Sequence, residues 1–124
     1  MPETIRILLT DDHLVLRAGL KALLEAERDF RVVGEASTGE EALEKAQQLH
    51  PDVVVMDLSM PGMGGLEATK KLTADTPCKV LVLTMHAEEE FLLPVLDAGG
   101  SGFVRKTSAD EDLTHAIRTV ARDE

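Results

Sequence analysis

Residues 5–12 read IRILLTDD, a short and almost wholly apolar run that ends in two aspartates. Two runs of the same kind follow along the chain, VVVMD and KVLVLT. Runs that are apolar at consecutive rather than alternate positions are typical of strands buried on both faces. With two shorter or less uniform candidates, the sequence predicts five strands, at residues 5–10, 31–36, 53–57, 79–84 and 102–104.

Amphipathic segments of helical length separate these runs. In one of them, Leu43, Ala46 and Leu49 lie at helical spacing after Thr38, which is a favourable N-cap residue. A series of strand–helix units predicts a parallel sheet with helices on both faces. At this length, right-handed crossovers favour a doubly wound, flavodoxin-like sheet in the order 2-1-3-4-5. We expect its helices at residues 14–27, 39–49, 64–74, 87–98 and 109–122.

Length and charge exclude several classes of function. The 124 residues form one domain, and the net charge of −10 opposes direct binding to nucleic acid or to an anionic membrane. A single cysteine, Cys78, allows no internal disulfide. The chain shows no secretory leader and no apolar run long enough to cross a membrane, so we expect a cytoplasmic protein.

Polar residues stand where the predicted strands end. Asp11 and Asp12 follow the first strand, Asp57 ends the third, Thr84 ends the fourth, and Lys106 comes just after the fifth. Sheets of this kind bind ligands at the carboxyl ends of their strands. A single aspartate after a strand is most often a cap or turn residue, and a threonine or a lysine there is ordinary, but chance then has to place all five residues at strand ends at once.

Three carboxylates in one small volume need a compensating positive charge. Because the expected ligands are all oxygen atoms, with no histidine or cysteine among them, they indicate a hard cation, Mg²⁺, with Mn²⁺ or Ca²⁺ as substitutes. Such a cluster supports phosphoryl transfer to a carboxylate. Asp57 is the best nucleophile because it ends the central strand, with Asp11 and Asp12 forming the base of the metal site.

The chain resembles the receiver domain of a bacterial two-component response regulator over residues 1–124, essentially its whole length. The fold implied is the CheY-like sheet predicted above. The segments that carry the resemblance are IRILLTDDH at 5–13, MDLSMPGMGG at 56–65, VLT at 82–84 and GFVRK at 102–106.

The resemblance implies a role for each residue at the strand ends. Asp57 is the phospho-acceptor. It binds Mg²⁺ together with Asp12 and the main-chain carbonyl of Ser59, and Asp11 acts through a water. The implied donor is a phosphohistidine on a sensor histidine kinase. The domain then catalyses only its own phosphorylation and dephosphorylation, and is no enzyme with turnover on a substrate.

Further residues are expected to tune or transmit the phosphorylated state. Thr84 hydrogen-bonds the phosphoryl group and Lys106 pairs with it. Thr84 also moves with Phe103, which replaces the tyrosine common at this switch position, although Phe103 alternatively packs in the core at all times. Three neighbours of the acceptor are expected to set the lifetime of the phosphate: Ser59, Met85 and His86.

The segments 12–20 and 32–36 are similar to the NarL/FixJ (LuxR-type) subfamily. Its members carry a C-terminal helix-turn-helix domain, so we expect that DNA is bound only through a domain missing from this chain. A homodimer on phosphorylation is a further expectation from the resemblance, and the sequence does not fix the oligomeric state. Within the first segment, His13 is interpreted as a helix-start residue of little functional weight.

Two positions depart from what helix and family patterns favour. Pro94 falls inside the fourth expected helix, where an interior proline costs about 3 kcal/mol, so we expect this helix to begin late or to be loose. Thr107 follows Lys106 where proline is frequent in the family, and the isomer of that bond is left open.

Other functions stay open on the sequence alone. A Mg²⁺-dependent phosphatase of the haloacid dehalogenase type also uses a strand-end aspartate, but it needs a second aspartate where Ser59 stands. A stand-alone or phosphorylation-independent interaction module would be favoured if Asp57 or Lys106 were replaced, and both are present. A purely structural domain leaves the strand-end carboxylates without a role.

Overall fold

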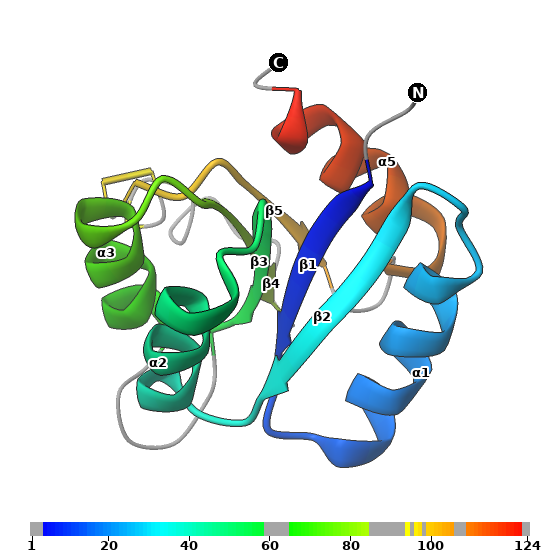
Figure 1. Ribbon diagram of the computed structural model, residues 1–124, viewed down its shortest axis with the longest axis horizontal. Helices are drawn as coiled ribbons and strands as arrows, with labels where there is room; N and C mark the ends of the chain where they lie inside the picture. The colour runs from blue at the N-terminus through cyan, green and yellow to red at the C-terminus, as the bar shows by residue number, and fades with distance from the viewer. Residues whose placement is uncertain are drawn as a thin grey trace.

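The computed structural model describes residues 4–58, 65–84, 94, 96–97, 99–105 and 109–122. Five parallel strands form one sheet in the order β2-β1-β3-β4-β5, which confirms the predicted doubly wound topology (Figure 1). The strands are β1 (Ile5–Thr10), β2 (Phe30–Ala36), β3 (Val53–Asp57), β4 (Lys79–Thr84) and β5 (Gly102–Arg105).

The described helices cover the two faces of the sheet. Helices α1 (Leu14–Glu25) and α5 (Ala109–Ala121) lie on one face, and α2 (Gly39–Leu49) and α3 (Gly65–Asp75) lie on the other (Figure 1). None of the helices that the structure describes has the length and apolar character needed to span a bilayer.

The alternation of side chains along each strand divides the core into two clusters. In β1, Ile7 and Leu9 pack under α1 and α5, whereas Leu8 packs under α2 and α3. All three are fully buried, as expected for an inner strand of a covered sheet. The continuous apolar runs in the sequence therefore reflect burial on both faces.

Several predicted boundaries differ from the structure by one or two residues. The largest difference is at α1, which ends at Glu25 rather than at residue 27. The chain turns there because Phe30 N–H donates to the Glu27 carbonyl and its ring enters the core. As a result β2 begins one residue early, at Phe30. The other differences are that β5 extends to Arg105, α3 extends to Asp75 and α5 ends at Ala121.

The start of α2 confirms the predicted cap. The Thr38 hydroxyl accepts a hydrogen bond from Glu41 N–H at 3.1 Å, and the Glu41 carboxylate accepts one from Ser37 N–H at 2.6 Å. This backbone hydrogen bond lowers the pKa of Glu41. The helix ends at Leu49 and is followed by the C-cap residue His50, whose φ of 50° is left-handed.

Arg118 joins α5 to the turn between α1 and β2. Its guanidinium donates to Glu27 at 2.6 Å and to Asp29 at 2.7 and 2.9 Å, and it lies 4.7 Å from the centre of the Phe30 ring. The hydrogen bonds from Arg118 hold the pKa of Asp29 below its usual range. These contacts hold the C-terminal part of α5 against the start of β2.

We expect Arg118→Ala to lower the free energy of unfolding by roughly 1–2 kcal/mol, the scale of partly exposed ion pairs plus a cation–π contact. Because the pKa of Asp29 is depressed, its contribution is complete above the unfolded pKa of about 4 and is lost as the pH falls further. The difference from the unmodified chain should therefore shrink below pH 4. Urea unfolding followed by circular dichroism measures it, with the exposed Arg28→Ala as the control; a constant difference would contradict the ion-pair explanation.

Candidate functional site

The carboxyl ends of β1 and β3 lie side by side, as the predicted strand order requires. Thr10 pairs with Met56 in the parallel register, so the next residues, Asp11 and Asp57, are neighbours. One ligand atom from each of Asp11, Asp12, His13 and Asp57 lies within 4.8 Å of the others. The structure thus brings together the three carboxylates that the sequence predicted, and adds an imidazole.

The cluster suits a hard divalent cation. The side chains of Asp11 and Asp57 are fully buried, whereas that of Asp12 is 28% exposed. Carboxylates this close repel one another, and a bound cation relieves that repulsion. Carboxylate oxygens are the donors that Mg²⁺ prefers, and it commonly keeps several waters. Oxygens from Asp11, Asp12 and Asp57 could hold such an ion.

His13 also lies beside these carboxylates, and the low functional weight expected for it stays a prediction. It is the N-cap residue of α1, as predicted, but its side chain makes no cap hydrogen bond. Instead, its Nδ1 lies 3.2 Å from an oxygen of Asp11 and 3.2 Å from an oxygen of Asp12. Its position directly after the acidic pair was the signal that could have placed it here.

Thr84 and Phe103 are the remaining predicted site residues that the structure describes. Asp57 pairs with Leu83, so Thr84 lies one residue further toward the same edge, and it is almost fully buried. Phe103 is half-buried and packs against the cluster under α2 and α3. This packing agrees with the core role left open for Phe103, and its movement as a switch stays a prediction.

Other predictions concern residues that lie outside the described part of the chain. Pro94, Leu96 and Asp97 have helical backbone, but most of the expected helix at 87–98 lies outside the described residues. The prediction that this helix begins late or is loose therefore stays a prediction. Five further residues with predicted roles also lie outside the described part of the chain: Ser59, Met85, His86, Lys106 and Thr107.

Gly65, the first residue of α3, packs tightly against the end of β3. A Cβ at this position would lie 2.0 Å from the Asp57 carbonyl oxygen and 2.8 Å from the Asp57 carbonyl carbon and the Leu58 Cα. All three are backbone atoms that no side-chain rotation can move. A glycine at position 65 is therefore required for α3 to meet β3 beside Asp57.

The sequence analysis also missed Arg17 and Glu35. Arg17, in α1, hydrogen-bonds both the Asp11 carbonyl and the Glu35 carboxylate. Each residue lies in one of the two segments that carry the subfamily resemblance, but neither segment indicates that they meet.

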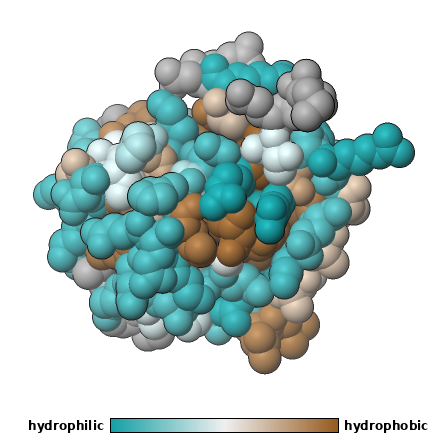
Figure 2. All heavy atoms as spheres, viewed as in Figure 1, coloured by the Kyte–Doolittle hydropathy of each residue, from teal (hydrophilic) through white to brown (hydrophobic). Residues whose placement is uncertain are grey.

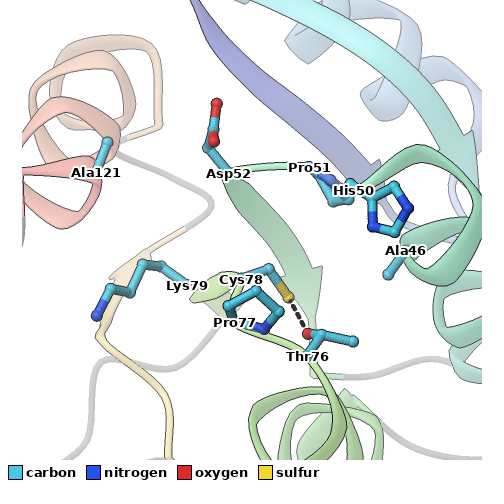
Figure 3. A pocket seen from close by; sticks show the side chains of 9 residues that line it. All are labelled: Ala46, His50, Pro51, Asp52, Thr76, Pro77, Cys78, Lys79 and Ala121. Atoms are coloured by element: carbon cyan, nitrogen blue, oxygen red, sulfur yellow. Dashed lines mark hydrogen bonds between the residues drawn. The ribbon is translucent and has the colours of Figure 1, made fainter.

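A pocket of about 300 Å³ lies at the opposite, amino-terminal edge of the sheet, around the starts of β3 and β4 (Figure 3). Its lining includes Asp52, Lys79 and the buried Cys78. The Cys78 sulfur lies 2.7 Å from the Thr76 hydroxyl, and burial raises the pKa of the thiol. A buried and protonated thiol is a poor nucleophile, so Cys78 is a packing residue.

Cys78 should accordingly react slowly with a thiol reagent such as 5,5′-dithiobis(2-nitrobenzoate). At pH 8 we expect labelling at least about 100-fold slower in the folded chain than in urea, because the reagent needs an accessible thiolate. Because the pKa is raised, the rate should still be climbing at pH 9. Equal rates with and without urea would show that the pocket exposes the thiol.

Apolar side chains are exposed beside the acidic cluster. Leu14 and Val15, at the start of α1, are 69% and 86% exposed. Figure 2 shows apolar atoms at the lower end of this face, over the start of α1, and also in its middle, between polar side chains. The rim of the site thus offers an apolar contact next to the carboxylates.

Comparison with known proteins gives consistent matches over nearly the whole chain. Residues 7–118 match the family described as the response regulator receiver domain. The transcriptional regulatory protein LiaR of Bacillus subtilis is 44% identical over 121 residues, covering 97% of this chain and 57% of LiaR. The response regulator UvrY of Escherichia coli K12 is 44% identical over 117 residues, covering 94% of this chain and 54% of UvrY. The chain spans about half the length of these curated relatives.

Solved structures agree with this. A LuxR-family two-component response regulator from Aurantimonas sp. SI85-9A1 has a TM-score of 0.93 and 39% identity, covering 98% of this chain and 88% of that one. The NarL signal receiver domain from Mycobacterium tuberculosis has a TM-score of 0.93 and 32% identity, covering 99% of this chain and all of that one.

Proposed function

This chain belongs to the response regulator receiver domain family, and from that membership we propose that it accepts a phosphoryl group on Asp57 in the presence of Mg²⁺. The observation that carries the proposal is the cluster at the carboxyl edge: Asp57 ends the central strand, and carboxylate oxygens of Asp11 and Asp12 lie within 4.8 Å of it. The matched relatives are of the LuxR and NarL kind, as the subfamily resemblance indicated.

The proposed reaction is an in-line displacement. An Asp57 carboxylate oxygen attacks phosphorus, the bond from phosphorus to the donor nitrogen breaks, and its electron pair leaves with the donor imidazole. Asp57 is held for this attack by a fully buried strand. Asp11, Asp12 and Asp57 would hold Mg²⁺, which when bound would offset the negative charge of the carboxylates and the phosphoryl oxygens.

The other site residues receive the roles that the family implies. Asp12, Asp57 and the Ser59 carbonyl bind the metal, and Asp11 acts through a water. Thr84 and Lys106 contact the phosphoryl group. Phe103 follows Thr84 as a switch residue. The proposed determinants of phosphate lifetime are Ser59, Met85 and His86.

For the whole protein, we propose a signalling role in the cytoplasm. A phosphohistidine of a sensor histidine kinase is the donor, and the exposed Leu14 and Val15 offer it an apolar contact beside the acceptor. The output is transcription regulation through a DNA-binding domain outside residues 1–124, with a homodimer on phosphorylation. This rests on relatives about twice as long that are named as regulators.

The test is intact-mass measurement after incubation with acetyl phosphate, with Mg²⁺ or with EDTA. We expect one phosphoryl group per chain with Mg²⁺ and none with EDTA. Borohydride reduction followed by peptide mapping should locate the acyl phosphate at Asp57. If no adduct forms and beryllium fluoride with Mg²⁺ leaves the thermal stability unchanged, the domain is a phosphorylation-independent module.

A further inference from the structure

Arg17 connects the acidic loop to the edge strand of the sheet. Its Nη1 donates to the Asp11 carbonyl oxygen at 2.7 Å, and its Nε donates to Glu35 Oε1 at 3.1 Å. The side chain is only 16% exposed although it carries a charge. One planar guanidinium thus spans from α1 to both β2 and the loop that carries Asp11 and Asp12.

Glu35 is held in place to receive Arg17. Its other carboxylate oxygen lies 3.4 Å from Lys21 Nζ, one turn further along α1, and Lys45 of α2 donates to its main-chain carbonyl. In the sheet, Glu35 pairs with Leu9, two residues before Asp11. The carboxylate that orients Arg17 is therefore fixed by the sheet and by two helices.

The Asp11 residue is anchored on each side of its backbone. Its N–H donates to the Ala36 carbonyl of β2 at 3.0 Å, and its carbonyl accepts from Arg17. Its carboxylate in turn accepts the His13 N–H at 2.8 Å, which folds the loop tightly. The peptide between Asp11 and Asp12 begins at the carbonyl that Arg17 holds, so the direction of both side chains depends on it.

We propose that Arg17, oriented by Glu35, is a positioning residue for the divalent cation. It fixes the Asp11–Asp12 peptide so that both carboxylates meet Asp57 in one place. The inference deepens the proposed function and rests on the same acidic cluster. It also gives a physical role to the two segments that carry the subfamily resemblance, since one contains Arg17 and the other Glu35.

The contrasting explanation is that the pair merely joins α1 to β2. Lysine separates the two explanations. It keeps the positive charge, but it lacks the planar fork that donates to two acceptors in fixed directions. Arg17→Lys therefore preserves the charge near the carboxylates and removes the geometry.

The experiment measures binding of Mn²⁺, from the electron paramagnetic resonance signal of the free ion, at a temperature where circular dichroism shows every variant folded. We expect Arg17→Lys to weaken Mn²⁺ binding about 10-fold, the scale on which residues behind metal ligands act. Glu35→Gln should weaken it less than Arg17→Lys does, because it loosens Arg17 without removing it. The double variant should match Arg17→Lys alone, since the two residues act in series.

Lys21→Ala is the matched control, because Lys21 contacts the same Glu35 carboxylate as Arg17, at 3.4 Å, from one turn further along α1. Its Mn²⁺ affinity should change less than 2-fold, within the range of an exposed ion pair. As a metal-free readout, amide exchange at Asp11 and Asp12 should speed up in Arg17→Lys and stay unchanged in Lys21→Ala. A variant that loses stability but keeps both Mn²⁺ affinity and amide protection would overturn the proposal.

The outcomes also separate this inference from the proposed function. If the unmodified chain binds Mn²⁺ and Arg17→Lys binds it weakly, but acetyl phosphate yields no adduct, the positioning role stands and phosphorylation fails. If the unmodified chain does not bind Mn²⁺ at all, the positioning role is refuted.

Discussion

Asp57→Asn should abolish phosphorylation by acetyl phosphate altogether. The amide has nearly the shape of the carboxylate, so the buried end of β3 keeps its packing, but its oxygen lacks the charge that makes the carboxylate a nucleophile. We expect no adduct by intact mass under conditions in which the unmodified chain is fully converted. The loss is complete rather than partial because no second described carboxylate combines full burial with a place at the end of the central strand.

Asp75→Asn provides the matched control, since it makes the same chemical change at an exposed residue at the end of α3. It should be phosphorylated like the unmodified chain. An adduct that persists in Asp57→Asn and maps to Asp12 or His13 would move the acceptor to another member of the cluster. That result would contradict the assignment of Asp57 while leaving the site itself in place.

Gly65→Ala should lower the free energy of unfolding by roughly 3 kcal/mol, the upper part of the range for overpacking. The added Cβ would lie 2.0 Å from the Asp57 carbonyl oxygen, so α3 or the end of β3 must move. Because the displaced atoms belong to the acceptor residue, phosphorylation should also slow. Urea unfolding followed by circular dichroism gives the first effect, and the rate of acetyl phosphate labelling gives the second.

Gly19→Ala makes the same substitution inside α1, where a Cβ meets nothing within 4 Å. This variant should be more stable by about 0.5–1 kcal/mol, since alanine favours a helix over glycine. The two variants are thus expected to differ in sign. If Gly65→Ala and Gly19→Ala prove equally stable, the result would contradict the close packing of α3 against Asp57.

The sequence predicted the fold and most of the site for one physical reason. Parallel strands place their carboxyl ends at a common edge, so the adjacent Asp11 and Asp12 and the distant Asp57 could be assigned to one place from strand order alone. Asp11 and Asp57 are 46 positions apart, and the register of β1 and β3 makes them neighbours. Continuous apolar runs were sufficient to identify those strands.

Contacts made by long side chains were not predictable in this way. Arg17 reaches Glu35 and the Asp11 carbonyl, and Arg118 reaches Asp29 across 89 positions of sequence. A guanidinium on a flexible stem has many potential partners, and hydrophobic periodicity does not choose among them. His13 shows the same limit at short range, because its helical position was predicted and the direction of its ring was not.

Strand β3 holds the proposed acceptor residue, Asp57, in a rigid position. All five of its residues are fully buried; Val53 and Val55 pack into one core cluster, and Val54 and Met56 into the other. Hydrogen bonding to β1 and β4 holds it on both edges. Such close-packed surroundings have low compressibility, so β3 can neither slide nor twist without disturbing both clusters at once. A phosphoryl group on Asp57 adds volume and negative charge at the end of this strand. The residues around the end of β3 have to move to accommodate it, because the strand itself cannot.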